Sequence, residues 1–436
     1  MSEAAVPAAL LAADGERPPT WRGGWRQGLS YGSLGLPLAF VALPLYVALP
    51  NHYATSYGLP LAWLGALLLA ARLVDAVADP FIGRWVDTLF GASRGAAWKA
   101  ALVAAAVLAA GFAGLFLPPV HSPVELMVWC GLMLVVTYLS YSIVTVIHQA
   151  WGARLGGDEP QRARIVAWRE GLALAGVLLA SVLPSLAGFG AMSMVFAVLL
   201  LCAMALLARA PHPAPSRPAA VAPSLALPWF NPAFVSLLVI YLLNGIASAV
   251  PATLVLFFIR DVLQAPNLEP LFLVLYFAAA GLSVPLWVRL VARIGLAGTW
   301  LVGMVLAIVV FVGAAWLGAG DVLAYAVVCT LSGVALGADL TMPSALLAGV
   351  IQRAGHTGQA EGAYFGWWNF ATKLNLAVAA GLALPLLQVF GYSPGARGSA
   401  ELLALSLAYC ALPCVLKLVA VGLLFKHSRV GTPTSS

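Results

Sequence analysis

Long apolar stretches separated by short polar segments fill most of the 436-residue chain. A membrane-spanning helix needs about 20 apolar residues to cross a hydrocarbon core of about 30 Å. Stretches of this length predict twelve spans, at 29–50, 60–82, 98–118, 124–150, 165–187, 190–209, 233–259, 269–290, 298–318, 322–351, 361–390 and 402–425. A transmembrane β-barrel would instead alternate in segments of about ten residues. The pattern therefore predicts an all-α membrane protein.

Composition agrees with this pattern, because 62% of the residues are hydrophobic and only 9% are charged. Soluble proteins carry about 25% charged residues, so lipid must cover most of this surface. Residues 1–28 lack the basic start and short apolar core of a cleavable signal peptide, and 29–50 is predicted as a retained span. The cysteines all lie in predicted spans without the His or carboxylate partners of a metal site, which predicts neither disulfides nor a metal centre.

Basic residues set the orientation of a membrane protein through its short loops. With the N-terminus inside, most Lys and Arg fall in cytoplasmic segments, and Arg260 and Arg397 are the basic residues left outside. Both termini are therefore predicted in the cytoplasm of a cell membrane, with a bacterial inner membrane as the expected location. The net charge of +6 is explained by anionic lipids at the cytoplasmic leaflet, without a nucleic-acid partner.

A proline-rich segment, APHPAPSRPAAVAPSLALP at 210–228, interrupts the spans after the sixth. Such a segment is an extended spacer rather than a helix. It predicts two six-helix halves, the layout of the major facilitator superfamily, whose halves surround a site near the membrane midplane. The predicted parts are a tail 1–28, a bundle 29–209, a linker 210–232, a bundle 233–425 and a tail 426–436.

Three charged residues lie inside the second span, at Arg72, Asp75 and Asp79. Spacings of three and four residues place them on one helical face, and ionisable groups at membrane depth are candidates for function. Their formal charge of about −1 suits one cation, either Na⁺ on carboxylate oxygens or a proton shared between like charges. The alternative is a structural Arg–Asp clamp between helices.

The same helix continues through Gly83 to Asp87 at its cytoplasmic end. A glycine at a helix exit allows another helix to approach closely, and charges beside it can latch the two halves in one state. Gating by Gly83 and Asp87 is one interpretation. Plain anchoring of a positively charged loop is the other.

Spans four and five carry polar residues that would face a cavity or another helix. Tyr138, Ser142, Thr145 and Gln149 form one stripe at spacings of four, three and four. Arg169 enters the fifth span, where it would bind an anionic or hydroxylated solute or pair with the carboxylates of span two. The alternative is an arginine that snorkels to the headgroups.

Span eleven carries Lys373 near the predicted midplane, and Asp339 in span ten is its predicted partner. Asn369 shares a face with Lys373, and Trp368 lies beside them. Aromatic rings next to polar side chains suit a sugar, whose CH face stacks while its hydroxyls form hydrogen bonds. Packing or interfacial aromatic residues are the alternative.

At these residues the chain resembles the glycoside–pentoside–hexuronide:cation symporters, the melibiose permease-like branch of the major facilitator superfamily. The segment ARLVDAVADPFIGRWVD matches the R-x-x-D-A-x-x-D-P-x-x-G pattern of that family. The resemblance implies that Arg72 takes the place of the family's membrane arginine. It also implies that Asp75 and Asp79 take the places of the two cation-binding carboxylates.

The resemblance extends to other spans. YSIVT at 141–145 is similar to the family's fourth-helix motif, which implies a substrate contact for Tyr141 and a hydroxyl near the cation for Ser142. Arg169 resembles the fifth-helix arginine and Lys373 the eleventh-helix lysine, with Asn369 at a neighbouring polar position. Taken over to this chain, these residues line a path for a solute and its coupling ion.

The chain departs from the family at three places. Its first span has no acid, and Thr145 stands where galactoside transporters have a fourth-helix acid, which argues against a galactoside. Ala78 replaces the amide before the second cation-site carboxylate and removes one oxygen ligand. Because Na⁺ needs a shell of oxygens and a proton needs one carboxylate, the sequence favours H⁺ over Na⁺.

The sequence thus predicts a secondary transporter, not an enzyme, that moves a small organic solute by alternating access with H⁺ or Na⁺, functions as a monomer in the bilayer and needs no cofactor. The residues predicted to face solute are Tyr141, Thr145, Arg169, Trp368, Asn369 and Lys373. The alternative is a proton-driven exporter or a transporter of a more apolar, lipid-like or aromatic solute. A membrane enzyme would need a base or nucleophile cluster facing water, which the scattered histidines do not form.

Overall fold

A computed structural model describes residues 21–213, 224–389, 391–392, 395 and 397–430 of the chain. Parts of the predicted tails and linker, at 1–20, 214–223 and 431–436, lie outside the described residues. The described part is helical and contains no β-strand. The all-α fold class predicted from hydropathy is confirmed.

The helices follow the predicted spans closely. In the first half they are α1 (Trp25–Gly32), α2 (Gly35–Leu43), a π-helical turn η2 (Pro44–Ala48), α3 (Leu49–Tyr57), α4 (Leu61–Ala92), α5 (Arg94–Phe116), α6 (Pro123–Arg154) and α7 (Glu159–Leu207). In the second half they are a 3₁₀ turn η3 (Leu227–Phe230), α8 (Pro232–Phe257), a π-helical turn η4 (Phe258–Val262), a 3₁₀ turn η5 (Pro266–Leu268), α9 (Glu269–Ala314), α10 (Val322–Arg353), α11 (Glu361–Val389), α12 (Ser399–Ser406), a π-helical turn η6 (Leu407–Ala411) and α13 (Leu412–Val430).

Two of these helices are hairpins that each contain two predicted spans. The turn in α7 falls at Gly188, with φ 76° and ψ 174°, and the turn in α9 falls at Gly295, with φ 72° and ψ 173°. A positive φ is readily available only to glycine, so the two glycines allow each chain reversal without a loop.

Seven of the described helices are long and apolar enough to cross a membrane. Two of them, α7 and α9, contain two spans each. The remaining predicted spans lie in α1–α3, α4 and α11, where α4 and α11 carry the charged and polar residues of the candidate site. Together they form the twelve crossings that the hydropathy pattern predicts.

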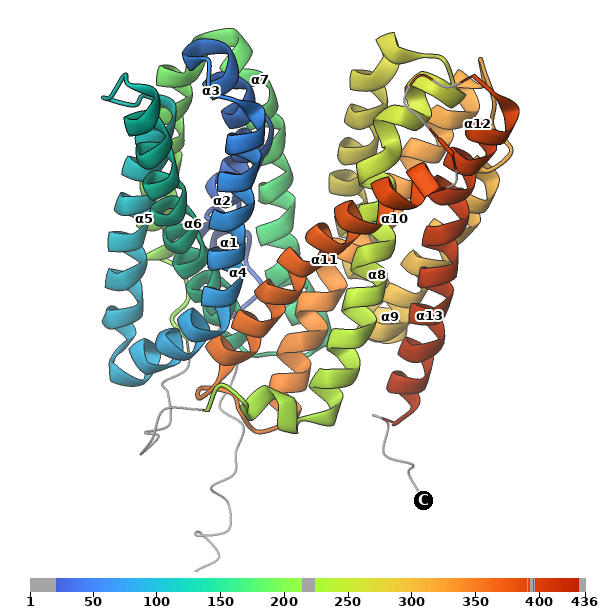
Figure 1. Cartoon of the computed structure of the whole chain (residues 1–436). Coiled ribbons are helices and arrows are strands. Elements are labelled where there is room, and N and C mark those ends of the chain that lie inside the picture. The colour runs from blue at the N-terminus through green and yellow to red at the C-terminus, as the bar shows by residue number, and fades with distance from the viewer. Residues whose placement is uncertain (1–20, 214–223, 390, 393–394, 396, 431–436) are drawn as a thin grey trace, which may run out of the picture.

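Figure 1 shows the helices in two groups, α1–α7 in blue to green and α8–α13 in yellow-green to red. The ribbons of the two groups diverge towards the top of the view and converge at the bottom, where α11 lies against α4. One large hydrophobic core belongs to the first half, and two further cores belong mainly to the second. The predicted bounds of the two halves and of the linker stay a prediction.

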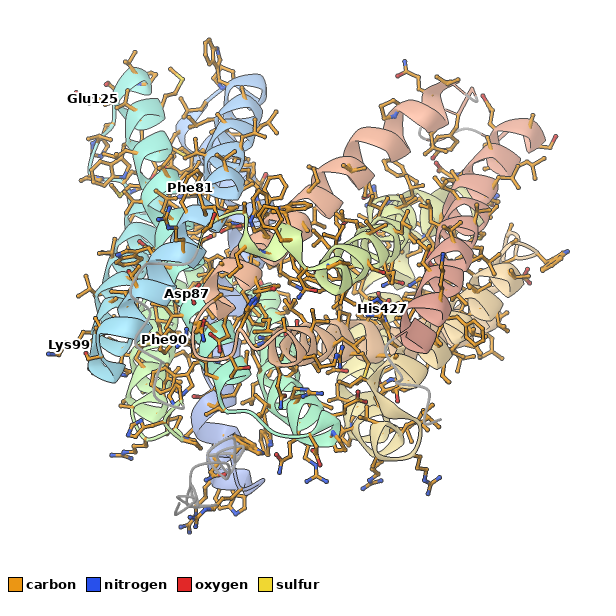
Figure 2. All side chains as sticks on the ribbon, turned by 90° about the horizontal axis from the view of Figure 1, so that it is seen from below. Phe81, Asp87, Phe90, Lys99, Glu125 and His427 are labelled. Atoms are coloured by element: carbon orange, nitrogen blue, oxygen red, sulfur yellow. The ribbon has the colours of Figure 1, made fainter. Side chains whose placement is uncertain are left out.

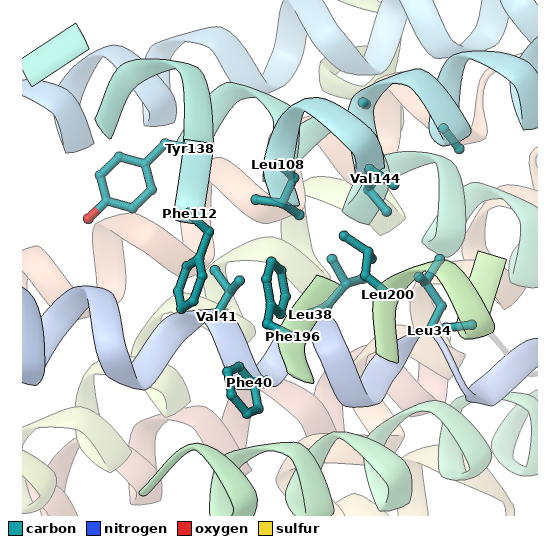
Figure 3. Close-up of a cluster of buried hydrophobic side chains, with 14 of the residues drawn as sticks. Leu34, Leu38, Phe40, Val41, Leu108, Phe112, Tyr138, Val144, Phe196 and Leu200 are labelled. Atoms are coloured by element: carbon teal, nitrogen blue, oxygen red, sulfur yellow. The ribbon is translucent and has the colours of Figure 1, made fainter. Parts of the chain in front are cut away.

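The core of the first half includes packed aromatic rings of α2, α5 and α7 (Figure 3). The ring of Phe196 lies 5.7 Å from that of Phe40 and 4.6 Å from that of Phe112, measured between centroids. Aromatic pairs at this separation are favourable beyond the area they bury. Tyr138, from the predicted polar stripe, belongs to this core and is only 4% exposed.

Candidate functional site

A cluster of four side chains, here named the central ion cluster, joins the two halves through α4, α6 and α11. The ammonium nitrogen of Lys373 lies 2.7 Å from a carboxylate oxygen of Asp75 and 2.7 Å from one of Asp79. It also donates a hydrogen bond of 2.9 Å to the hydroxyl of Ser142, which in turn donates one of 2.7 Å to Asp75. Lys373 thus sits among three oxygens from the other half of the molecule.

Helix geometry explains why α4 supplies both carboxylates. Asp75 and Asp79 are four residues apart, so they lie one turn from each other on the same face. Their side chains are 3% and 0% exposed, while that of Lys373 is 13% exposed. Two carboxylates and one ammonium group leave a formal charge of about −1 in a poorly solvated place, which favours uptake of one further positive charge.

The carboxylate oxygen of Asp79 that does not face Lys373 is also buried. Among the described residues, Asp79 Oδ1 is buried without a hydrogen-bond donor. A buried acceptor in that state carries the desolvation penalty of an unmade hydrogen bond. A proton on this carboxyl would relieve the charge excess of the cluster.

Arg72 lies one turn before Asp75 on α4. Its guanidinium lies over the ring of Tyr138, 5.1 Å from the centroid, which is within the range of a cation–π contact. The place of Arg72 in cation coupling, which the resemblance implies, stays a prediction.

The predicted pair of Lys373 with Asp339 is wrong. Asp339 instead forms a 2.9 Å ion pair with Lys417 of α13, and both belong to what we name the C-terminal ion cluster. Asp339 also accepts hydrogen bonds from Asn244, Ser248 and Trp300. Sequence spacing fixes the depth of a charge along its helix, whereas the direction in which the side chain points depends on how the helix is turned in the bundle.

The predicted solute-facing residues of α6 and α11 differ in exposure. Tyr141 and Thr145 are partly exposed on α6 beside Ser142. Trp368 is 2% exposed, and its ring stacks on that of Tyr241 from α8 at 3.9 Å. Asn369 is also buried, at 9% exposed. In this conformation the structure leaves the α6 residues more accessible to a solute than those of α11.

Arg169 does not contact the carboxylates of α4. Its guanidinium lies 2.6 Å from the carboxylate of Glu170 and donates a 3.3 Å hydrogen bond to Ser344 of α10. Long side chains allow these sequence neighbours to meet although their backbone directions differ. Arg169 therefore lies at the contact between the two halves, where a solute role for it stays a prediction.

A second set of inter-half contacts, here named the lower closure, lies at the bottom of Figure 1. Asp87 accepts hydrogen bonds of 2.7 and 2.8 Å from the backbone N–H groups of Gly362 and Ala363, at the start of α11. Arg154 lies 3.1 Å from Asp87 and 2.8 Å from Glu361. All three charged side chains are at most 1% exposed.

The electrostatics of this closure are favourable because a helix N-terminus carries partial positive charge and free N–H donors. Asp87, from the opposite half, supplies a negative charge and hydrogen-bond acceptors to the N-terminus of α11. Figure 2 shows Asp87 inside the ring of helices, whereas Lys99 points outward at its edge. The contribution of Arg154 and Glu361 was not anticipated, although an acid at a helix start and a base at a helix end are visible in the sequence.

Further contacts extend the lower closure to α7, α9 and α10. The carboxylate of Glu159 accepts a 2.7 Å hydrogen bond from the backbone N–H of Leu296, directly after the α9 turn. Arg162 donates a 2.6 Å hydrogen bond to Gln352. The two halves are thus held by charged groups at the termini of several helices.

Gly83 allows the close crossing of α4 and α11. A Cβ atom added there would lie 2.1 Å from the carbonyl oxygen of Gly362, and one added at Gly362 would lie 2.2 Å from that of Gly83. Gly366 makes a similar contact with the carbonyl of Asp79. Small residues at such crossings let helix backbones touch, which brings Asp79 and Asp87 to the α11 surface.

Within the described residues, no three or more His, Cys, Asp or Glu side chains gather as metal ligands would. The central ion cluster offers two carboxylates and one hydroxyl from the chain. This is a small oxygen set for Na⁺ and a sufficient one for a proton.

Comparison with known proteins agrees with the fold. The family profile described as "MFS/sugar transport protein" matches residues 28–428. The chain belongs to this family of major facilitator superfamily membrane transporters.

Among curated proteins, the chain is similar to the inner membrane symporter YicJ of Escherichia coli (strain K12), with 27% identity over 159 residues. The match covers 36% of this chain and 33% of the relative, so the chain spans about a third of the length of the curated relative it matches.

Solved structures share the fold at low sequence identity. A bacterial homologue of the iron transporter ferroportin in an outward-facing state has a TM-score of 0.71 at 17% identity, covering 93% of this chain and 99% of that one. The transporter FucP in the outward conformation has a TM-score of 0.65 at 13% identity, covering 90% and 98%. The human organic anion transporter MFSD10 has a TM-score of 0.60 at 18% identity, covering 94% and 100%.

Proposed function

We propose that this protein is a proton-coupled symporter of a small organic solute of the sugar or glycoside type, with Asp75 and Asp79 as the coupling carboxylates. The observation that carries the proposal is the position of the Lys373 ammonium group, 2.7 Å from both carboxylates. The ammonium group of Lys373 occupies the place that a coupling ion would take between the two carboxylates. The family match and the similarity to a symporter support transport of this kind.

In the proposed cycle a proton and Lys373 share the two carboxylates. Uptake of one proton by Asp79 neutralises the cluster, because two carboxylates and one ammonium group otherwise leave a formal charge of about −1. Protonation of Asp79 leaves Lys373 of α11 paired with Asp75 alone, so it weakens the electrostatic contact of α11 with α4. The bound proton therefore biases the equilibrium between the two orientations of the halves.

Alternating access also requires an opening and a closing end. The lower closure brings the halves together at the end where we propose the cytoplasm lies, which agrees with the basic residues predicted on that side of a bacterial inner membrane. In this arrangement the central ion cluster faces solute from the opposite side. Tyr141, partly exposed on α6, is proposed as the first contact for solute hydroxyls, and Thr145, whose hydroxyl oxygen is buried in this conformation, as a later one.

The test uses purified protein in liposomes that contain a pH-sensitive dye. Methyl glucoside, xylose and glucuronate are added as probes of the three solute classes, and solute-dependent proton entry is recorded. Asp79→Asn is expected to abolish proton entry, whereas Glu125→Gln, an exposed carboxylate at the start of α6, leaves it unchanged. Proton entry at the wild-type rate in Asp79→Asn refutes the role of Asp79, and solute entry driven by Na⁺ alone assigns the coupling ion to Na⁺.

A further inference from the structure

The second half contains a cavity of about 160 Å³ that is separate from the central ion cluster. It lies between α8, α9, α10, η6 and α13. Its aromatic wall comprises Phe272, Tyr276, Phe277, Phe311, Tyr325 and Tyr409. The ion pair of Asp339 and Lys417, together with Ser248, contributes to its lining.

The size and wall of this cavity suit one aromatic ring. An engineered cavity of about 150 Å³ with an apolar lining binds benzene in another protein. Two of the ring hydroxyls are already used, since Tyr325 and Tyr409 share a 2.8 Å hydrogen bond. These walls therefore present ring faces and edges, against which another ring packs favourably.

The polar lining narrows the choice of ligand. Asp339 accepts four hydrogen bonds, from Asn244, Ser248, Trp300 and Lys417, so its oxygens are satisfied. Lys417 donates to Asn244 at 2.7 Å and to Asp339 at 2.9 Å. Among the described residues, this leaves one of its three N–H groups without an acceptor.

The charges of Asp339 and Lys417 cancel, so the cavity has no formal charge to attract an ion. It offers the remaining N–H of Lys417 and the hydroxyl of Tyr276 beside a largely apolar wall. A sugar would bury several hydroxyls there without partners, which is costly. An aromatic ring with a single oxygen acceptor has the matching pattern.

We propose that the cavity of the second half binds a small neutral aromatic compound with one hydroxyl or carbonyl oxygen. The ring lies among the aromatic side chains, and its oxygen accepts the remaining N–H of Lys417. This site goes beyond the proposed symport function and does not depend on it, because none of the four residues of the central ion cluster lines the cavity.

The test uses the full-length protein in lipid nanodiscs and 4-fluorophenol as the probe, followed by fluorine NMR. Fluorobenzene, which lacks the oxygen, is the matched ligand control. Wild type is expected to bind 4-fluorophenol saturably, with competition by unlabelled phenol, and to bind fluorobenzene several-fold more weakly.

Two variants fill the cavity. Ala335→Phe and Ala307→Phe replace cavity-lining alanines that are 2% and 4% exposed. Each is expected to weaken 4-fluorophenol binding by about tenfold or more, because the new ring takes the volume of the ligand. Ala324→Phe, at an exposed position of α10 outside the cavity, is the matched control and keeps wild-type affinity.

Size-exclusion profiles and melting temperatures establish which variants fold, and Ala307→Leu gives a milder filling if both phenylalanine variants fail. The proposal is overturned by the absence of saturable binding to wild type. It is also overturned by unchanged affinity in a folded filling variant. Equal affinity for fluorobenzene removes the hydrogen bond to Lys417 from the proposal.

Discussion

At the scale of single side chains, Lys373 decides the charge balance of the central ion cluster. Its ammonium group is within 2.7 Å of two carboxylates that are almost fully buried. Removing one member of a buried ion pair leaves an uncompensated charge, which destabilises more than the pair itself stabilises. The three side chains therefore differ in their effect on stability. Loss of the lysine leaves two negative groups, whereas loss of one aspartate leaves a neutral pair.

Lys373→Gln is expected to lower the free energy of unfolding by about 3–5 kcal/mol, because both carboxylates lose their counter-charge. Asp79→Asn is expected to lower it by about 1 kcal/mol, since Asp75 keeps Lys373. Denaturation in mixed micelles, followed by tryptophan fluorescence, measures both, with the exposed Glu125→Gln as control. A larger loss in Asp79→Asn than in Lys373→Gln contradicts this charge balance.

The partners of the buried lysines show what the sequence leaves open at this scale. The spacing of Asp75 and Asp79 was enough to predict a shared face, and the structure places them on one. The sequence predicts a pair of Lys373 with Asp339 because both lie at membrane depth. Lys417 received no role, although a lysine within a span also needs a partner. Pairing between helices depends on the rotation of each helix, which a single sequence does not encode locally.

At the scale of helices, the crossing of α4 and α11 joins the central ion cluster to the lower closure. Gly83, Gly362 and Gly366 allow backbone contact along this crossing. The same contact presents the N–H groups of Gly362 and Ala363 to Asp87. A side chain at the crossing must therefore disturb the hydrogen bonds of the α11 N-terminus.

Gly83→Ala is expected to separate α4 from α11, because its Cβ would lie 2.1 Å from a carbonyl oxygen. Hydrogen–deuterium exchange of peptides that cover residues 361–366 should then be at least about tenfold faster, as Gly362 and Ala363 lose protection. Gly91→Ala is the matched control on the same helix, since a Cβ there meets nothing within 4 Å. Equal exchange in the two variants would falsify the role of Gly83.

The order and length of the helices could be predicted because apolar stretches of span length are a strong signal. The continuous helical hairpins of α7 and α9 could not be predicted from this signal. In α7 and α9 the predicted spans are continuous with each other through Gly188 and Gly295. The sequence has 42 glycines, and hydropathy does not show which of them adopt a positive φ. Backbone reversal there depends on the packing of the flanking helices.

At the scale of the whole molecule, the lower closure determines which end of the protein is shut. It joins charged side chains of one half to helix termini of the other, at Asp87, Arg154, Glu361, Glu159 and Arg162. Charged contacts of this kind have a defined geometry and are lost together when the halves rotate. The sequence predicts a gate at Gly83 and Asp87, but the backbone N–H partners of Asp87 lie 275 and 276 residues further along the chain.

Asp87→Asn tests the closure directly, because it removes the charge that faces Arg154 and the N-terminus of α11 while keeping the side-chain shape. Because Glu361 keeps Arg154 paired, the closed arrangement is expected to lose about 1–2 kcal/mol, which shifts the ratio of the two arrangements by about five- to thirtyfold. Spin labels replace Lys99 of the first half and Lys426 of the second, both exposed, in a background without the native cysteines.

Double electron–electron resonance spectroscopy of the protein in nanodiscs measures the distance between the labels. Asp87→Asn is expected to add a longer-distance population, as the ends that carry the labels move apart (Figure 2 marks Lys99 and His427, the neighbour of Lys426). Asp321→Asn, the same chemical change at the exposed start of α10, should leave the distribution as in wild type. An unaltered distribution in Asp87→Asn would mean that backbone packing at the glycine crossing holds the halves together without the buried charges.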